Sequence, residues 1–134
     1  INTNQTFAFA NDTVTASYGS ATAKAHADTN TTDADGVEST TPGLKTNLIR
    51  DLKINVANEL AKTDWYITRN TEKTTAIPSS ISTHRDAVRT KQAAQEAQIT
   101  GASDTAALET LHTYTTDANG VQSRPLGTLP ILEI

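Results

Sequence analysis

The chain contains no cysteine and no methionine among its 134 residues. The lack of cysteine excludes disulfide bonds, thiolate metal sites and cysteine nucleophiles. The lack of methionine leads us to expect that the encoded protein begins before Ile1. No apolar run approaches the roughly 20 residues of a membrane span, and the first residues lack the basic and apolar regions of a signal peptide. We therefore expect a soluble protein with no membrane partner.

Aromatic residues are also scarce, at 4% of the chain, whereas threonine and alanine are the commonest residues. The length suits a single domain over residues 1–134. Its core must be built mainly from leucine, isoleucine, valine and alanine, whose small side chains bury little apolar area each. The free energy gained by burying this area is expected barely to exceed the entropic cost of ordering the chain. We therefore expect partner surfaces or self-association to add stability, as in a homo-oligomer or a symmetric assembly.

The net charge of −4 is unevenly distributed along the chain. Residues 44–91 hold nine basic and five acidic side chains, whereas residues 1–43 and residues 92–134 each hold one basic and five acidic side chains. A nucleic-acid surface needs denser lysine and arginine with interleaved aromatic residues. We therefore expect no nucleic-acid partner, and favour charge matching between the middle and the flanks, within or between subunits.

The N-terminal region, residues 1–40, has the pattern of β-hairpins. Residues 6–10 and 13–18 alternate in polarity on either side of the turn residues Asn11 and Asp12, which predicts a hairpin. Residues 21–30 are small and polar, and this composition predicts a loop or a weakly paired strand.

One nine-residue segment occurs twice, because residues 31–39 match residues 115–123 at seven of nine positions. Each copy contains an acidic or amide residue followed by glycine, which is typical of tight turns that require a positive φ. We predict that Gly36 and Gly120 have positive φ in two similar hairpins. These hairpins flank a helical region, and the second is expected to be placed where it can pair with the first.

The helical region is predicted to span residues 41–112. Thr41 and Pro42 fit an N-cap followed by the first helical residue. Apolar residues then recur every four positions, which predicts a helix over residues 43–61. The residues of this stripe are Leu44, Leu48, Leu52, Val56 and Leu60.

A second long helix is predicted from Pro78 to a stop at Gly101. Between the two helices, residues 63–67 either extend the first or begin a new turn, and residues 70–75 form a polar connector. Because this connector is short, we expect the helices to pack antiparallel. Ser103 is the expected cap of a short third helix.

The C-terminal region, residues 113–134, combines the second hairpin with an apolar tail. The tail, residues 126–134, contains Pro130 and follows Pro125, so it is predicted to be an extended edge segment. Together these elements predict an α+β fold. It consists of an antiparallel helical hairpin and a short third helix, flanked by N- and C-terminal β-hairpins.

Patterns for metal, cofactor or catalytic sites are incomplete. Asp33 and Asp35 begin like a calcium loop, but the twelfth position, where a bidentate glutamate is needed, is Leu44. None of the three histidines has a second ligand at helical spacing, and neither a nucleotide-binding glycine motif nor a nucleophile elbow occurs. We therefore expect no metal, no cofactor and no enzymatic activity.

Trp65 is the only tryptophan, and the sequence allows two interpretations of it. It is either a core residue where the long helix meets the Pro78 helix, with Arg85 or Arg89 near it, or an exposed anchor for a partner. We favour the buried position, for which Trp65→Ala would lower the free energy of unfolding by about 3 to 5 kcal/mol.

The segment around Trp65 also resembles a known family. The order T-D-W-Y, R, I-P, Y-R, L-R is found in phage tail assembly chaperone-like domains and related tail-fibre or virion proteins, with tyrosine where this chain has His84. The residues that correspond to this pattern are Thr63, Asp64, Trp65, Tyr66, Arg69, Ala76, Ile77, Pro78, His84, Arg85, Val88 and Arg89. The resemblance implies structural or partner-contacting roles without catalysis for Asp64, Trp65, Tyr66, Arg69, Pro78, Arg85 and Arg89.

The resemblance implies a non-enzymatic structural component of a bacteriophage tail, located in the virion as a fibre-associated, baseplate or adaptor subunit. Its expected partners are other phage tail proteins. One alternative is a tail assembly chaperone that acts in the host cytoplasm and is not retained in the particle. A further alternative, an adhesin or glycan-binding module, rests on the abundance of threonine and asparagine alone.

Overall fold

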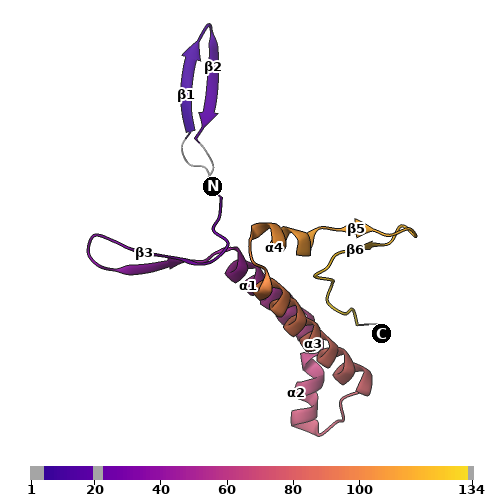
Figure 1. Cartoon of the computed structure of the whole chain (residues 1–134). Coiled ribbons are helices and arrows are strands. Elements are labelled where there is room, and N and C mark those ends of the chain that lie inside the picture. The colour runs from indigo at the N-terminus through magenta and orange to yellow at the C-terminus, as the bar shows by residue number, and fades with distance from the viewer. Residues whose placement is uncertain (1–4, 20–22, 133–134) are drawn as a thin grey trace.

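The computed structural model describes residues 5–19 and 23–132, and it confirms the predicted α+β class (Figure 1). Within these residues, four helices are accompanied by three separate two-stranded antiparallel sheets. The helices are α1 (Leu44–Ala61), α2 (Asp64–Lys73), α3 (Ser79–Gly101) and α4 (Thr105–His112). The strands are β1 (Gln5–Ala10), β2 (Thr13–Tyr18), β3 (Thr29–Thr32), β4 (Glu38–Thr41), β5 (Thr115–Thr116) and β6 (Gln122–Ser123).

The two long helices, α1 and α3, pack antiparallel and form the body of the molecule (Figure 1). Near one end, Lys45 Nζ on α1 donates a hydrogen bond to the carbonyl oxygen of Thr100 on α3 at 2.8 Å. Near the other end, Arg85 Nη1 on α3 donates to the carbonyl oxygen of Leu60 on α1 at 2.9 Å. These contacts join the start of each helix to the end of the other and confirm the predicted antiparallel pair.

The hydrophobic core is small and contains no aromatic side chain. It lies between α1, α3, α4 and the C-terminal tail, which all contribute to it: its buried members are Leu52, Val56, Val88, Ile99, Ala102, Leu108 and Leu126. The predicted α1 stripe supplies Leu52 and Val56 in full, while the other three leucines of the stripe are partly buried against the cluster. The core is therefore built from small aliphatic side chains, as the composition predicts.

The C-terminal tail is held along α3 by glutamine side chains. Gln95 Nε2 donates to the carbonyl oxygen of Leu126 at 3.0 Å, and Gln98 Nε2 donates to that of Pro125 at 3.2 Å. The predicted edge position is wrong for the described part of the tail, residues 126–132, which belongs to no sheet. The side-chain amides of α3, rather than a neighbouring strand, donate hydrogen bonds to the first carbonyl groups of the tail. Residues 133 and 134 of that prediction lie outside the described residues.

The beginning of α1 differs from the predicted cap. Thr41 is the last residue of β4, Pro42 precedes the helix, and Gly43 is the N-cap residue. The acceptor for the Gly43 N–H comes from far away in the sequence, since Asp28 Oδ1 accepts this hydrogen bond at 2.7 Å. The chain before β3 therefore caps α1, which a search for local capping residues does not reveal.

Two other helix boundaries also differ from the predictions. A separate helix, α2, begins at Asp64, which agrees with the second of the two alternatives for residues 63–67. The predicted connector over residues 70–75 is wrong in its first part, because α2 continues to Lys73 and Thr74 is its C-cap residue, with a left-handed φ of 52°. The cap of α4 is Asp104 and not Ser103, because the Asp104 carboxylate accepts a hydrogen bond from a backbone N–H of the first turn. Both residue types are good caps, so sequence alone does not choose between neighbours.

The β3–β4 and β5–β6 hairpins have nearly the same turn. Gly36 N donates to the carbonyl oxygen of Asp33 at 3.1 Å, and Gly120 N donates to that of Asp117 at 3.0 Å. The two glycines have φ values of 81° and 80°, which confirms the prediction. The expected pairing between hairpins is wrong, because each described sheet consists of one hairpin only. Their polar strands lack an apolar face that would bring them together.

The N-terminal hairpin, β1–β2, forms as predicted and projects from the helices (Figure 1). Asn11 and Asp12 have φ values of 51° and 59°, the pair of positive angles that a two-residue hairpin turn requires. Residues 21 and 22 of the predicted loop over residues 21–30 lie outside the described residues, and its last two residues belong to β3.

Candidate functional site at the corner between α1 and α2

The predicted site residues lie around the corner where α1 ends, α2 begins and α3 starts. Asp64, Trp65, Tyr66 and Arg69 are on α2, Pro78 is the N-cap residue of α3, and Arg85 and Arg89 are on α3. The structure brings most of them into two groups. One group fixes the corner internally, and the other carries the exposed Trp65.

Arg85 is the centre of the internal group. Its side chain is buried, and Nη1 donates to Thr63 Oγ1 at 2.7 Å and to Asp64 Oδ1 at 2.8 Å. The same nitrogen also donates to the carbonyl oxygen of Leu60 in the last turn of α1. A cation is favourable there because the carbonyl groups at a helix C-terminus are partly negative and unpaired within the helix. Arg85 therefore joins α1, α2 and α3.

Trp65 is not a core residue, so the prediction that it is buried is wrong. Its exposed fraction is 51%. The inward face of α2 is formed by Tyr66, Arg69 and Asn70, which are partly buried and follow the buried Thr63 at helical spacing. Trp65 lies about 100° around the helix from Tyr66 and is directed away from this face. The exposed-anchor interpretation is the one that agrees with this position.

The second group is a stack of two aromatic rings and a guanidinium, in which Trp65 is exposed while Tyr66 and Arg69 are partly buried. The Trp65 and Tyr66 ring centroids lie 4.0 Å apart. Arg69 Cζ lies 4.5 Å from the Trp65 ring centroid and 5.5 Å from that of Tyr66. Cation–π contacts of this kind restrict side-chain motion and leave a rigid amphipathic surface. We name Trp65, Tyr66 and Arg69 the aromatic cluster.

A shallow pocket adjoins the aromatic cluster. Trp65 and Tyr66 line it together with Pro78 and Ile81 of the α3 start and Leu132 of the C-terminal tail. Its volume is about 230 Å³. Most of the side chains that line the pocket are apolar or aromatic. The cluster therefore borders a hollow that an apolar side chain of another protein would fit.

Arg89 is separate from both groups. Its guanidinium forms an ion pair with Asp86 one turn earlier on α3, with Nη1 3.1 Å from Oδ1, and both side chains are exposed. It contacts neither Trp65 nor Asp64 in any interaction of the described residues. The two α3 arginines of the motif therefore differ, since only Arg85 reaches the corner.

Two residues of the motif to which the sequence analysis assigned no role, Thr63 and His84, also belong to the corner. Thr63, 1% exposed, accepts from Arg85 and donates through Oγ1 to the carbonyl oxygen of Leu60. His84 is buried with Nε2 3.4 Å from Glu59 Oε1 of α1. His84 and Arg85 are adjacent on α3, and both approach the end of α1. For His84 the signal is a polar residue on the inner face of α3, because buried polar groups usually have a partner nearby.

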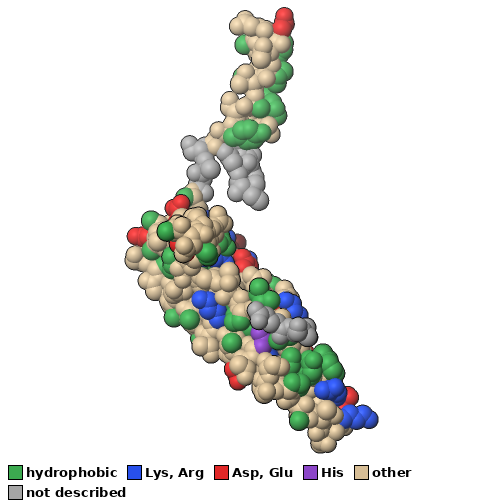
Figure 2. Space-filling view, turned by 90° about the vertical axis from the view of Figure 1, so that its right-hand side faces the viewer, with side chains coloured by type: hydrophobic (Ala, Val, Ile, Leu, Met, Phe, Trp, Pro, Cys, Tyr) green, Lys and Arg blue, Asp and Glu red, His purple; other side chains and the backbone are tan. Residues whose placement is uncertain are grey.

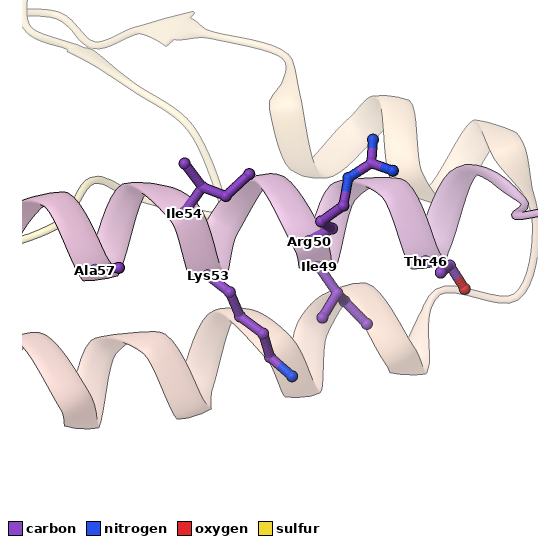
Figure 3. Close-up of a pocket in the computed structure, with 6 residues that line it drawn as sticks. All are labelled: Thr46, Ile49, Arg50, Lys53, Ile54 and Ala57. Carbon is purple, nitrogen blue, oxygen red and sulfur yellow. The ribbon is translucent and has the colours of Figure 1, made fainter.

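A second exposed apolar surface lies along α1 (Figure 3). The residues that line this open groove are Thr46, Ile49, Arg50, Lys53, Ile54 and Ala57, which follow one another at helical spacing. In Figure 3, Ile49 and Lys53 point toward α3, whereas Ile54 and Arg50 point the other way. Lys53 Nζ lies 3.6 Å from Glu96 Oε1 of α3. The groove is thus lined by the apolar side chains of Ile49, Ile54 and Ala57 together with the cations Arg50 and Lys53.

The described residues contain no group of three or more histidine and acidic side chains that would hold a metal ion. Nor does any of the described helices combine the length and the hydropathy needed to cross a membrane. The backbone N–H of Gly43, followed by the side chain of Thr46, lowers the pKa of Asp28 because both stabilise its ionised form.

Comparisons with protein-family models, curated proteins and solved structures find no match for the chain. The function is therefore argued from the arrangement of the residues, together with the resemblance of residues 63–89 to the phage tail pattern.

Proposed function

We propose that the protein is a non-enzymatic structural subunit of a larger protein assembly. One observation carries this proposal: the chain has an accessible surface of 9800 Å². A compact monomer of 14.3 kDa exposes about 6,800 Å². The difference, about 3,000 Å² on one chain, is at least as large as the roughly 1,000 to 2,500 Å² that each partner contributes to a permanent interface. An arrangement with this much excess surface suits a chain that is completed by contacts with other proteins.

The excess surface lies largely in the hairpins. Every residue of the six described strands is exposed, so the hairpins add nothing to the hydrophobic core. An isolated two-stranded hairpin is at best marginally stable in water. Arms of this kind gain stability when another protein packs on them, as expected for a subunit that connects its neighbours.

The aromatic cluster is the proposed contact for a different tail protein. Tryptophan, tyrosine and arginine are the residues that most often dominate binding energy at interfaces. Here Trp65 is half exposed, Arg69 holds its ring, and Arg85 fixes the helix that carries both. A preorganised surface loses little conformational entropy on binding. The neighbouring pocket at Pro78 and Leu132 would receive a side chain of the partner.

The assembly that we propose is a bacteriophage tail, in which the protein is a fibre-associated, baseplate or adaptor subunit. This assignment is supported by the resemblance around Trp65, whose pattern residues include both the buried Arg85 and the exposed Trp65. A chaperone that leaves before the particle is complete would use the same exposed cluster. Retention in the particle separates these two functions.

Co-sedimentation of the protein with purified tails tests the proposal. We expect wild-type protein to sediment with tails and Trp65→Ala protein to remain largely in the supernatant, with Arg89→Ala as the matched control that behaves like wild type. Wild-type protein that binds tail proteins in the lysate but is absent from purified tails would identify the chaperone instead. Binding to immobilised glycans without any tail association would identify an adhesin.

A further inference from the structure

The N-terminal hairpin has one apolar and one polar face. Its register pairs Phe7 with Ala16 and Phe9 with Val14, and directly paired residues point to the same side of a sheet. Tyr18 extends this side, opposite Gln5, and its hydroxyl accepts a hydrogen bond from Gln5 Nε2 at 3.1 Å. The other face holds only small or hydroxyl side chains: Thr6, Ala8, Ala10, Thr13, Thr15 and Ser17.

The apolar face is uncovered. Phe7, Phe9, Val14 and Tyr18 are 68%, 72%, 63% and 64% exposed, and the first two are the only phenylalanines of the chain. At roughly 200 Å² for a whole aromatic side chain, the three rings alone leave about 400 Å² exposed. An apolar patch of this size is as large as the largest patch on a typical monomer, and such patches often have a function. Figure 2 shows hydrophobic side chains gathered along one side of the projecting hairpin.

We propose that this face packs against the same face of a second copy of the chain, so that two hairpins form a small four-stranded sandwich. The inference rests on the proposed role as an assembly subunit and names the surface through which copies contact each other. A twofold axis makes the contact self-complementary, because each Phe7–Phe9 pair then meets the apolar face of the other hairpin. Stacked sheets of this kind lie about 10 Å apart.

Two features favour a second copy over a different partner. The described hairpin carries a single charged residue, Asp12, at the turn and none on either face, so two copies meet without repulsion and no charge selects a different partner.

The area of the apolar face is also large enough for a contact between two copies. Two faces would remove about 800 Å² of aromatic surface from water, and Val14 and Ala16 add to this. The total reaches about 1,000 Å², the lower limit for a specific contact, so the association is expected to be reversible.

Single-cysteine cross-linking tests the contact directly, since the chain has no cysteine of its own. Ala16→Cys places a thiol in the middle of the apolar face, and Ala8→Cys places one in the middle of the opposite face. With purified protein and a short bismaleimide, we expect a covalent dimer for Ala16→Cys at a yield several-fold above that for Ala8→Cys, rising with protein concentration. Equal yields for the two variants, or no dimer for Ala16→Cys, would overturn the proposal.

A charge on the face provides an independent test. Phe7→Asp in the Ala16→Cys background should abolish the cross-linked dimer, whereas Thr6→Asp on the opposite face should leave it. Circular dichroism checks that both variants keep the helices. Persistence of the dimer in Phe7→Asp would rule out this face. These experiments use the protein alone, so a negative result would count against the dimer and not against the proposed association with tails. In the same way, a failure to associate with tails would not count against the dimer.

Discussion

The Arg85 guanidinium on α3 forms an ion pair with the carboxylate of Asp64 at the start of α2, with Nη1 2.8 Å from Oδ1. The same nitrogen reaches the end of α1, where it contacts Thr63 Oγ1 and the carbonyl oxygen of Leu60. One buried cation therefore satisfies groups at the end of one helix and the start of another. This contact determines how α2 presents the aromatic cluster.

Arg85→Ala is expected to lower the free energy of unfolding by about 1.5 to 3 kcal/mol, because it removes a buried charged donor from Thr63 Oγ1 and from the Leu60 carbonyl oxygen, which then keeps its hydrogen bonds from Thr63. The exposed carboxylate of Asp64 is solvated by water and adds little to this loss. Arg89→Ala is the matched control and should cost less than about 0.5 kcal/mol, since its ion pair with Asp86 is exposed. Urea unfolding followed by circular dichroism measures both. Equal losses in the two variants would contradict the special position of Arg85.

Trp65→Ala is expected to change the free energy of unfolding by less than about 1 kcal/mol, because the side chain is half exposed and outside the core cluster. Ile99→Ala, at a site that is 1% exposed, should cost about 2 to 5 kcal/mol and serves as the comparison. Chemical denaturation of the two variants decides the matter. A larger loss of unfolding free energy for Trp65→Ala than for Ile99→Ala would indicate that Trp65 is part of the core.

Gly43→Ala is expected to destabilise the protein by about 1 to 3 kcal/mol, although alanine normally favours helices. The added Cβ would collide with the Ala27 backbone and lie 2.8 Å from Asp28 N. Gly101→Ala is the control, because no atom lies within 4 Å of its Cβ position and the residue is helical. There we expect no loss, or a gain of up to about 1 kcal/mol. Thermal melting distinguishes the two, and a neutral Gly43→Ala would show that residues 27 and 28 do not pack on α1.

The capping role of Asp28 predicts a specific acid sensitivity. Its pKa is lowered from 3.8 by the Gly43 N–H and the Thr46 side chain, so the ionised form stabilises the fold above the unfolded pKa. This contribution disappears as the pH falls through the lower pKa of the folded state. The melting temperature of wild type should therefore exceed that of Asp28→Ala at neutral pH, and the gap should narrow below about pH 4. A gap that is unchanged down to the acid transition would argue against an ionic cap.

The elements of the fold that follow from local pattern were predictable from the sequence. The four-residue leucine repeat from Leu44 to Leu60 gave α1, and the glycine turns gave hairpins at Gly36 and Gly120, since both patterns reflect backbone geometry within a few residues. The cap of α1 was not predictable, because its acceptor is Asp28, which precedes the helix by a whole hairpin. Contacts across such distances depend on the packed structure and leave no local pattern.

The candidate site was predictable in its composition but not in its geometry. The motif identified Arg85 and Trp65, yet size and hydrophobicity suggested that Trp65 fills the core. The rotation of α2 decides otherwise, because Thr63 and Tyr66 occupy its inward face. That rotation is set by the Arg85 contacts with Thr63 and Asp64, and polar contacts between helices have no periodic signature. The apolar face of the N-terminal hairpin, in contrast, follows from strand alternation once the register is known.

Quantitative mass spectrometry of purified phage tails tests the central proposal, a structural subunit of the assembly, most directly. The protein should be present at a fixed ratio to the other tail proteins in independent preparations, and that ratio should fall for Trp65→Ala at unchanged lysate levels. Protein that is abundant in the lysate and absent from the purified tails would contradict the account.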